Sequence, residues 1–244
     1  MRKNLPGAEE DNSGPDEMAV FSIPDSLFAE CCRFMRSKIT RLHSDNPPRS
    51  ILISSALKGE GKTFVACNLA ASISQTPDEY VLLVDSDLRN PRMHKVFGIP
   101  SVEKGLATYL EGNAALPELL KKTAFDKLTL LPAGNPAAAP AELLSSERMK
   151  ELIREIRDRY RDRFIIIDSA PLGLAPETSV IANSVDAVLL VVRHGKSPRD
   201  AVKEAVKRIK KEKLMGVIYN AYDESSELHN RYGYYKHGYG KNKR

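Results

Sequence analysis

Short apolar runs alternate with helical patterns along most of the chain. Six of these runs predict buried strands, at residues 50–54, 80–84, 128–131, 164–167, 187–192 and 217–219. Helical spacing lies between them, near residues 62–75, 103–111, 141–160, 175–184 and 198–211. Nearly continuous apolar strands with intervening helices predict an α/β domain, in which helices cover both faces of a mostly parallel sheet.

The two ends of the chain differ from this pattern. Residues 1–20 are rich in Gly, Pro, Asn and acidic residues, which is typical of a disordered segment. A helix is expected over residues 25–40, because apolar residues recur every four positions and Asp25 or Ser26 can cap its start. The periodicity ends at Asp223. We therefore expect a disordered segment at 1–20, one domain at 21–222 and a flexible tail at 223–244.

The composition favours an ordinary cytoplasmic protein. The 244 residues are 42% hydrophobic and 28% charged, which suits a single well-packed domain. No apolar run approaches the roughly 20 residues of a membrane span. The charged N-terminus lacks the apolar stretch of a signal peptide. The three cysteines lack CxxC or CxH spacing, which favours buried thiols over a disulfide framework or a metal site.

The formal net charge of +5 is unevenly distributed. Residues 229–244 contain five basic residues and no acidic residue. Such a tail fits an acidic surface, a phosphate-rich ligand or a solubility role, and charge alone does not choose among them. Residues 203–213 are also strongly basic, and here a solvated helix is favoured over a nucleic-acid patch.

The clearest chemical motif is a glycine-rich loop at residues 56–63, which follows the first predicted strand and opens a helix. Small residues let backbone N–H groups curl around phosphate oxygens, and the helix N-terminus adds positive potential. In such a phosphate-binding loop, or P-loop, Lys62 reaches the β- and γ-phosphates and Thr63 places its hydroxyl on Mg²⁺. The usual pattern opens with Gly, where this chain has Ala56. The loop predicts ATP binding.

Acidic residues follow two other predicted strands. Asp85 and Asp87 follow the strand at 80–84, and Asp168 follows the strand at 164–167. Ligands of an open α/β sheet bind beyond the carboxyl ends of its strands, so these residues are expected beside the loop. A carboxylate after an apolar strand is suited to hold Mg²⁺, directly or through water.

These motifs together resemble the bacterial tyrosine kinases, P-loop autokinases of capsule and exopolysaccharide production. The resemblance covers nearly all of residues 25–244. The loop is similar to the family's Walker A motif, residues 81–89 match its Walker A′ pattern of apolar residues followed by DxDxR, and residues 164–171 match its Walker B strand. Ala170 stands where the Walker B motif usually has Pro, and residues 131–134 and 140–144 are also similar to the family.

The resemblance implies roles for particular residues. Lys62, Asp85 and Asp87 would be catalytic, and Asp85 would orient or deprotonate the acceptor hydroxyl. Thr63, Asp85 and Asp168 would hold Mg²⁺. The residues expected to contact ATP are Lys58, Gly59, Glu60, Gly61, Lys62, Thr63, Phe64 and Asn220, the last at the adenine.

Two further patterns match the family. Glu30, Arg33 and Arg36 form an ExxRxxR pattern on the first helix, and this pattern implies contacts between subunits of a ring-shaped homo-oligomer. The tail contains a cluster of tyrosines that the resemblance implies are the phosphoacceptors, phosphorylated in trans. They are Tyr232, Tyr234, Tyr235 and Tyr239.

The same resemblance implies a separate partner, a transmembrane activator of the polysaccharide co-polymerase type, which would recruit the cytoplasmic chain to the inner face of the membrane. Nucleic acid is not expected as a partner. Two alternatives stay open: an ATPase switch of the partition or cell-division type, and an ATP-binding scaffold without kinase activity. Leu57 disfavours the first, because the partition and division ATPases have a signature Lys at that place in the loop.

Overall fold

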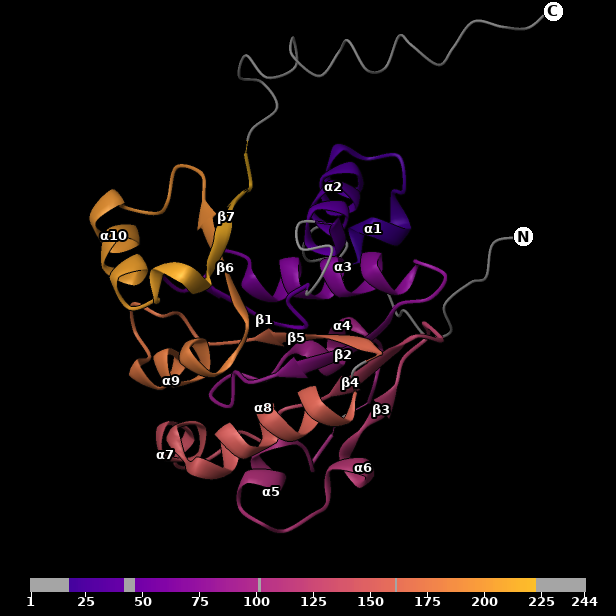
Figure 1. The fold of residues 1–244 in the computed structure, drawn as a ribbon, viewed down its shortest axis with the longest axis vertical. Helices are drawn as coiled ribbons and strands as arrows, with labels where there is room; N and C mark the ends of the chain where they lie inside the picture. Colours follow the sequence, from indigo (N-terminus) through magenta and orange to yellow (C-terminus); the bar gives the residue numbers. More distant parts are fainter. Residues whose placement is uncertain (1–17, 42–46, 101, 161, 223–244) are drawn as a thin grey trace, which may run out of the picture.

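A computed structural model describes residues 18–41, 47–100, 102–160 and 162–222. Its centre is a seven-stranded sheet in the order β3-β4-β2-β5-β1-β6-β7 (Figure 1). Every strand pair in it is parallel except β3 with β4. The strands are β1 (Ser50–Ser55), β2 (Tyr80–Asp85), β3 (Lys121–Lys122), β4 (Leu128–Leu131), β5 (Arg163–Asp168), β6 (Ala187–Arg193) and β7 (Leu214–Asn220). The predicted α/β class is confirmed.

Helices cover both faces of the sheet, as the apolar strands predict (Figure 1). One face carries α1 (Ala19–Ser22), α2 (Leu27–Arg41), α3 (Lys62–Ser74) and α4 (Met93–Val96). The other carries α5 (Leu106–Leu110), α6 (Leu116–Leu119), α7 (Pro140–Ser145), α8 (Glu147–Arg159), α9 (Pro176–Ser184) and α10 (Arg199–Lys207). A 3-10 turn, η1 (Lys211–Lys213), precedes β7. Within the part of the chain that the structure describes, no helix is both long and apolar enough to cross a membrane.

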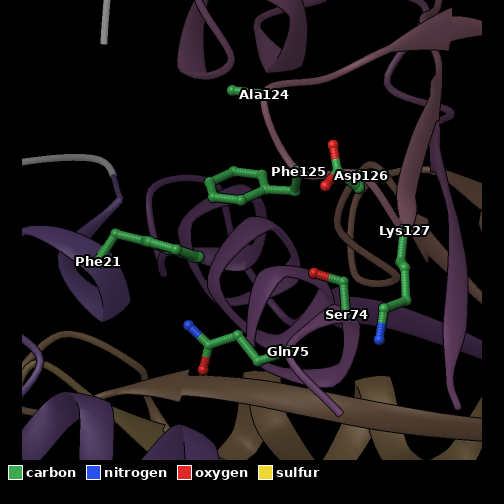
Figure 2. Close-up of a pocket in the computed structure, with 7 residues that line it drawn as sticks. All are labelled: Phe21, Ser74, Gln75, Ala124, Phe125, Asp126 and Lys127. Carbon is green, nitrogen blue, oxygen red and sulfur yellow. The ribbon is translucent and has the colours of Figure 1, made fainter. Parts of the chain in front are cut away.

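The N-terminal helices α1 and α2 pack on α3. The Val20 N–H donates to the Asn68 side chain over 3.0 Å, and the Phe21 ring lies 4.2 Å from the Phe125 ring, centroid to centroid. A cavity of about 270 Å³ opens beside these two rings (Figure 2). Its lining comes from α1, the end of α3 and the turn before β4: Phe21, Ser74, Gln75, Ala124, Phe125, Asp126 and Lys127. This cavity therefore lies at the opposite end of α3 from the phosphate loop.

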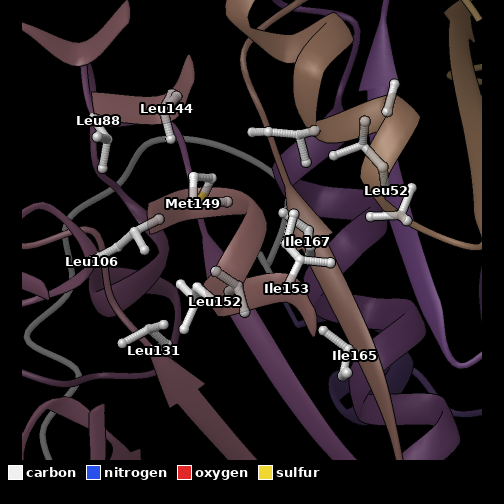
Figure 3. Close-up of a cluster of buried hydrophobic side chains, with 14 of the residues drawn as sticks. Leu52, Leu88, Leu106, Leu131, Leu144, Met149, Leu152, Ile153, Ile165 and Ile167 are labelled. Atoms are coloured by element: carbon white, nitrogen blue, oxygen red, sulfur yellow. The ribbon is translucent and has the colours of Figure 1, made fainter. Parts of the chain in front are cut away.

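Successive side chains of each strand point to opposite faces of the sheet and pack into two separate cores. Leu52, Ile165 and Ile167 face α8 and its neighbours, where Met149, Leu152 and others fill the space (Figure 3). Ile51, Ile53 and Ile166 face α3 and α2. Since each central strand is buried on both faces, its continuous apolar sequence is explained by this two-sided packing.

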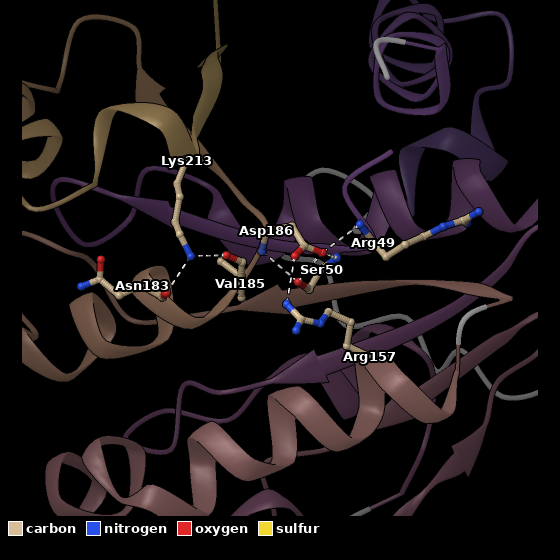
Figure 4. Close-up of polar contacts among 7 residues, drawn as sticks. All are labelled: Arg49, Ser50, Arg157, Asn183, Val185, Asp186 and Lys213. Carbon is tan, nitrogen blue, oxygen red and sulfur yellow. Dashed lines mark hydrogen bonds and ion pairs between the residues drawn. The ribbon is translucent and has the colours of Figure 1, made fainter. Parts of the chain in front are cut away.

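A polar cluster ties the start of β1 to the start of β6 and to α8 (Figure 4). Asp186 Oδ2 accepts hydrogen bonds from the Arg49 and Ser50 N–H groups and from the Ser50 hydroxyl, at 3.1, 2.9 and 2.9 Å. Asp186 Oδ1 pairs with Arg157 at 3.2 Å. Burial opposes the charge on Asp186, but the hydrogen bonds from Ser50 and Arg49 outweigh it and lower the pKa of this carboxyl.

Several predicted element boundaries were wrong. The expected helix at 141–160 is two helices, because Ser146 ends α7 and its hydroxyl caps α8 by accepting from the Met149 N–H. The helix expected at 103–111 begins at Leu106, and the one expected at 198–211 ends at Lys207. The strand expected at 217–219 spans Leu214–Asn220. The sequence did not predict α1, α4, α6 and β3, because these elements are too short to show a periodic pattern.

We predict that Asp186→Asn lowers the free energy of unfolding by about 2 to 4 kcal/mol at pH 7, because it weakens four hydrogen bonds to a partly buried carboxylate. Because folding lowers this pKa, the contribution is full above the unfolded value of about 3.9 and is lost as pH falls through the folded value. Urea unfolding of wild type and variant measures it. Asp200→Asn, at an exposed position on α10, is the control. Equal losses for both variants would contradict the prediction.

Candidate functional site: a phosphate loop beside two acidic strand ends

Three neighbouring strands end at the same edge of the sheet. β5 lies between β2 and β1, and its register pairs Asp168 with Asp85 on one side and with Ile53 on the other. The loop that follows β1 therefore lies beside both acidic strand ends. The sequence predicts this convergence, and the strand order produces it.

The loop after β1 has the backbone that phosphate binding needs. Gly59 and Gly61 have φ angles of 78° and 94°, a left-handed region that other residues rarely adopt. Gly173, after β5, packs against the carbonyl of Ala56, and a Cβ there would lie 2.2 Å from that oxygen. α3 begins at Lys62, so its free N–H groups and positive end face the loop.

Lys62 is buried at the start of α3, with 8% of its surface exposed. Burial lowers the pKa of its ammonium group, while the carboxylates of Asp168 and Asp87 oppose that effect. The side chain is therefore a largely buried cation with acidic groups nearby. Such a cation is suited to pair with phosphate oxygens.

Thr63 and Asp168 are joined directly. The Thr63 hydroxyl donates to Asp168 Oδ2 over 2.6 Å, and Asp168 Oδ1 is buried and accepts no hydrogen bond from the described residues. A hydroxyl and an unsatisfied carboxylate oxygen are hard ligands that suit Mg²⁺. The described residues contain no cluster of three or more His, Cys, Asp or Glu arranged for a metal. The pair thus fits a cation that is shared with phosphate and water, as P-loop sites use it.

Asp85 is buried to the same extent as Asp168. Its two oxygens accept the Asp87 and Met93 N–H groups, at 3.2 and 3.3 Å. Burial, with a contribution from the charge on Asp168, raises the pKa of Asp85 to about 8. Burial also raises the pKa of Asp168 to about 7, although the hydrogen bond from Thr63 and the charge of Lys62 oppose it. Asp87 is half-buried and lies closer to solvent.

Arg89, the arginine of the DxDxR motif, has a partner that the sequence did not predict. Arg89 pairs with Glu177 at 2.8 Å, and Glu177 is buried in the first turn of α9. An acidic residue after Pro176 is ordinary at a helix start, so no local pattern indicates this contact. The ion pair links the loop after β2 to the segment after β5.

Other predicted ligand residues take different positions around the loop. Lys58 is exposed, and the Phe64 ring packs 4.7 Å from the Phe28 ring of α2, centroid to centroid. The Asn220 amide donates to the carbonyl of Glu60 over 2.9 Å, at the end of β7. Asn220 therefore contacts the loop itself, and its role at adenine stays a prediction.

The predicted subunit-contact residues lie on α2. Glu30 and Arg33 pair with each other at 2.6 Å on the exposed side of the helix. Arg36 donates to the Ser72 carbonyl over 2.7 Å and so ties α2 to the end of α3. The four predicted acceptor tyrosines, Tyr232, Tyr234, Tyr235 and Tyr239, lie outside the described residues.

Several known proteins are similar to this chain in sequence. Residues 49–216 match the family model described as an AAA domain. The chain is 34% identical to the tyrosine-protein kinase YwqD of Bacillus subtilis, covering 87% of this chain and 88% of that protein. It is 33% identical to the tyrosine-protein kinase CpsD of Streptococcus agalactiae, covering 76% and 80%. It matches the tyrosine-protein kinase wzc of Salmonella typhi at 30% identity, but over only 31% of that longer protein.

Solved structures of two proteins share the fold of this chain. The kinase domain of the Escherichia coli tyrosine kinase ETK superposes with a TM-score of 0.78 at 27% identity, covering 92% of this chain and 86% of that domain. The septum site-determining protein MinD of Pyrococcus horikoshii, complexed with Mg-ADP, superposes with a TM-score of 0.61 at 27% identity, covering 73% and 72%.

We predict that Asp85→Asn stabilises the nucleotide-free protein at about pH 8.5 by about 1 to 3 kcal/mol, because it removes one of two facing buried carboxylates. Folding raises this pKa, so the wild-type contribution is full below the unfolded value of about 3.9 and is lost as pH rises through the folded value. The gain should therefore be smaller at about pH 5. Urea unfolding at both pH values tests this, with the exposed Asp78→Asn as control. A gain that does not change with pH would contradict it.

Proposed function

We propose that this chain, which belongs to the family of bacterial tyrosine kinases, transfers the γ-phosphoryl group of ATP to tyrosines of its own C-terminal tail. The observation that carries the proposal is the convergence of Lys62 and Thr63 with Asp85 and Asp168 at one sheet edge. In this proposal the P-loop binds the phosphates, and the buried carboxylates beside it hold the acceptor hydroxyl.

The proposed mechanism relies on positioning and charge, as phosphoryl transfer generally does. Lys62 and the N–H groups of the loop bind the β- and γ-phosphates. Thr63 and Asp168 would hold Mg²⁺, which neutralises charge on the phosphates when it is bound. Asp85, in its ionised form, would accept the proton of the incoming tyrosine hydroxyl, and Asp87 would support the cation from the solvent side.

The acceptor proposal rests on the tail sequence and its starting point. β7 ends at Asn220, beside the loop, and residues 223–244 follow it. A chain of that length, fully extended, spans at most roughly 70 to 80 Å. That reach permits transfer in trans to a neighbouring subunit. Each phosphotyrosine would add about −1.5 to −2 charge to a basic segment and so favour its release from an acidic site.

Subunit contacts are proposed for α2. Glu30 is exposed and available to a neighbouring chain, whereas Arg33 also donates to the Pro24 carbonyl over 2.9 Å and Arg36 is bonded to α3. A ring built through this stripe would bring each tail near another subunit's loop. We further propose a separate transmembrane activator that recruits the chain to the inner membrane face, in support of capsule or exopolysaccharide production. The longer relative wzc, of which this chain matches 31%, is consistent with a kinase region that works beside other segments.

An ATPase switch of the MinD type is the alternative that the comparisons raise, since MinD shares 27% identity and the overall fold. Leu57 argues against it, because this residue occupies the place of the signature Lys and packs against the apolar core. Phosphotyrosine formation in the purified protein separates the two functions.

We predict that Lys62→Met abolishes autophosphorylation when the variant is incubated alone with ATP and Mg²⁺. The loss should exceed about a hundredfold, because a buried cation that neutralises phosphate charge is removed. Anti-phosphotyrosine blotting and mass spectrometry of the tail peptide measure it. Lys203→Met, on the exposed side of α10, is the matched control. A Lys62→Met protein that still gains phosphotyrosine would overturn the proposed function.

We predict that the double variant Glu30→Ala, Arg33→Ala shifts the protein toward monomers while it stays folded. An exposed ion pair contributes only about 0 to 1 kcal/mol to the stability of the chain, so the variant should unfold near the wild-type midpoint. Sedimentation velocity gives the mass. The control Lys150→Ala, Glu147→Ala removes a comparable i,i+3 pair from α8. An unchanged mass distribution in the α2 variant would exclude this stripe as the contact.

A further inference from the structure

A short connector holds the phosphate loop from its outer side. We call residues 193–198, which join β6 to α10, the strap. Arg193 donates from Nη1 to the carbonyl of Gly59 over 3.0 Å, and the Ser197 hydroxyl donates to Glu60 Oε1. The strap thus contacts two consecutive residues of the loop.

The direction of the Ser197 hydrogen bonds is fixed by its partners. The Ser197 hydroxyl accepts from the Arg193 N–H over 2.8 Å, which closes the strap into a tight turn. A backbone N–H can only donate and an ionised carboxylate can only accept. The Ser197 hydroxyl must therefore receive from Arg193 and give its proton to Glu60. One side chain both shapes the strap and attaches it to the loop.

Glu60 places an acidic side chain in the middle of the phosphate loop. Its side chain is buried, with 1% exposed, and a carboxylate there would repel phosphate if it turned inward. Both of its oxygens are instead occupied. Oε2 accepts the Leu57 N–H over 2.7 Å, across the loop, and Oε1 accepts the Ser197 hydroxyl. The carboxylate therefore serves as an internal tie between the two halves of the loop.

A second contact fixes the same residue by its backbone. The Asn220 amide donates to the Glu60 carbonyl over 2.9 Å, and a Cβ at Gly61 would lie 2.1 Å from that amide nitrogen. The strap and the end of β7 together hold the loop around Glu60, where Gly59 and Gly61 have the left-handed conformation that the loop requires. None of these contacts uses Lys62 or Thr63, which stay available to the nucleotide.

We propose that Ser197 is a positioning residue for ATP, which acts through Glu60 to hold the loop in its phosphate-binding shape before the nucleotide arrives. A preformed loop does not have to be ordered on binding, so the benefit is seen as ATP affinity. The chemical step uses Lys62 and the carboxylates and should proceed at its normal rate once ATP is bound. The inference rests on the loop binding ATP, as the proposed function requires, and not on which tyrosine is the acceptor.

The test is a double-mutant cycle on the full-length protein, with the Kd for a fluorescent ATP analogue as readout. Ser197→Ala should raise Kd by about tenfold, the effect of losing one hydrogen bond to a charged group. In a Glu60→Gln background, which keeps the side-chain volume but removes the charge, the same change should raise Kd by only about twofold. Ser197→Thr keeps the hydroxyl and should restore most of the affinity.

Two controls separate positioning from a structural role. Ser184→Ala, at the end of α9, removes a hydroxyl that bonds only within its own helix and should leave Kd unchanged. For Ser197→Ala, KM for ATP should rise while kcat at saturating ATP stays within about twofold of wild type. The proposal is overturned if Ser197→Ala leaves Kd unchanged, raises it equally in both backgrounds, or lowers kcat instead. A wild-type protein that binds ATP but phosphorylates no tyrosine would refute the proposed function and leave this inference intact.

Discussion

The burial of two facing carboxylates is the constraint on which this structure depends. Asp85 and Asp168 end neighbouring strands in register, and burial raises the pKa of both. Two such groups cost stability in the nucleotide-free chain, so the surrounding fold has to hold them in place. The strand order β2-β5-β1 does this by setting the phosphate loop, Thr63 and the positive end of α3 beside them. A cation and a phosphate chain are the partners that such a pair fits.

The stability that offsets this cost comes from elsewhere in the fold. The central strands are buried on both faces by two separate apolar cores. At the other end of the same strands, the hydrogen bonds of Asp186 fasten β1, β6 and α8 together. The sheet is therefore held at one edge by satisfied polar groups, while at the opposite edge Asp168 Oδ1 has no hydrogen-bond partner among the described residues.

The sequence predicted the central strands and the convergence of their acidic ends because these features depend on local patterns. Apolar runs marked β1, β2 and β5, and a strand followed by a glycine-rich loop and Lys-Thr has few other interpretations. The break at Ser146 was missed, although Ser followed by Glu147 is itself a capping signal, because apolar spacing continues across it. Long-range contacts could not be predicted. Ser197 reaches Glu60 across 137 positions and Arg89 reaches Glu177 across 88, and no local pattern connects either pair.

We propose that this site phosphorylates the tail of another copy of the chain. The most direct measurement mixes two full-length proteins with labelled ATP and Mg²⁺. One carries Lys62→Met and an intact tail, and the other has a wild-type loop with Tyr232, Tyr234, Tyr235 and Tyr239 changed to Phe. If transfer occurs in trans, labelled phosphate appears on the tail peptide of the Lys62→Met protein. If that peptide stays unlabelled while the unmixed wild-type protein labels its own tail, transfer in trans is contradicted.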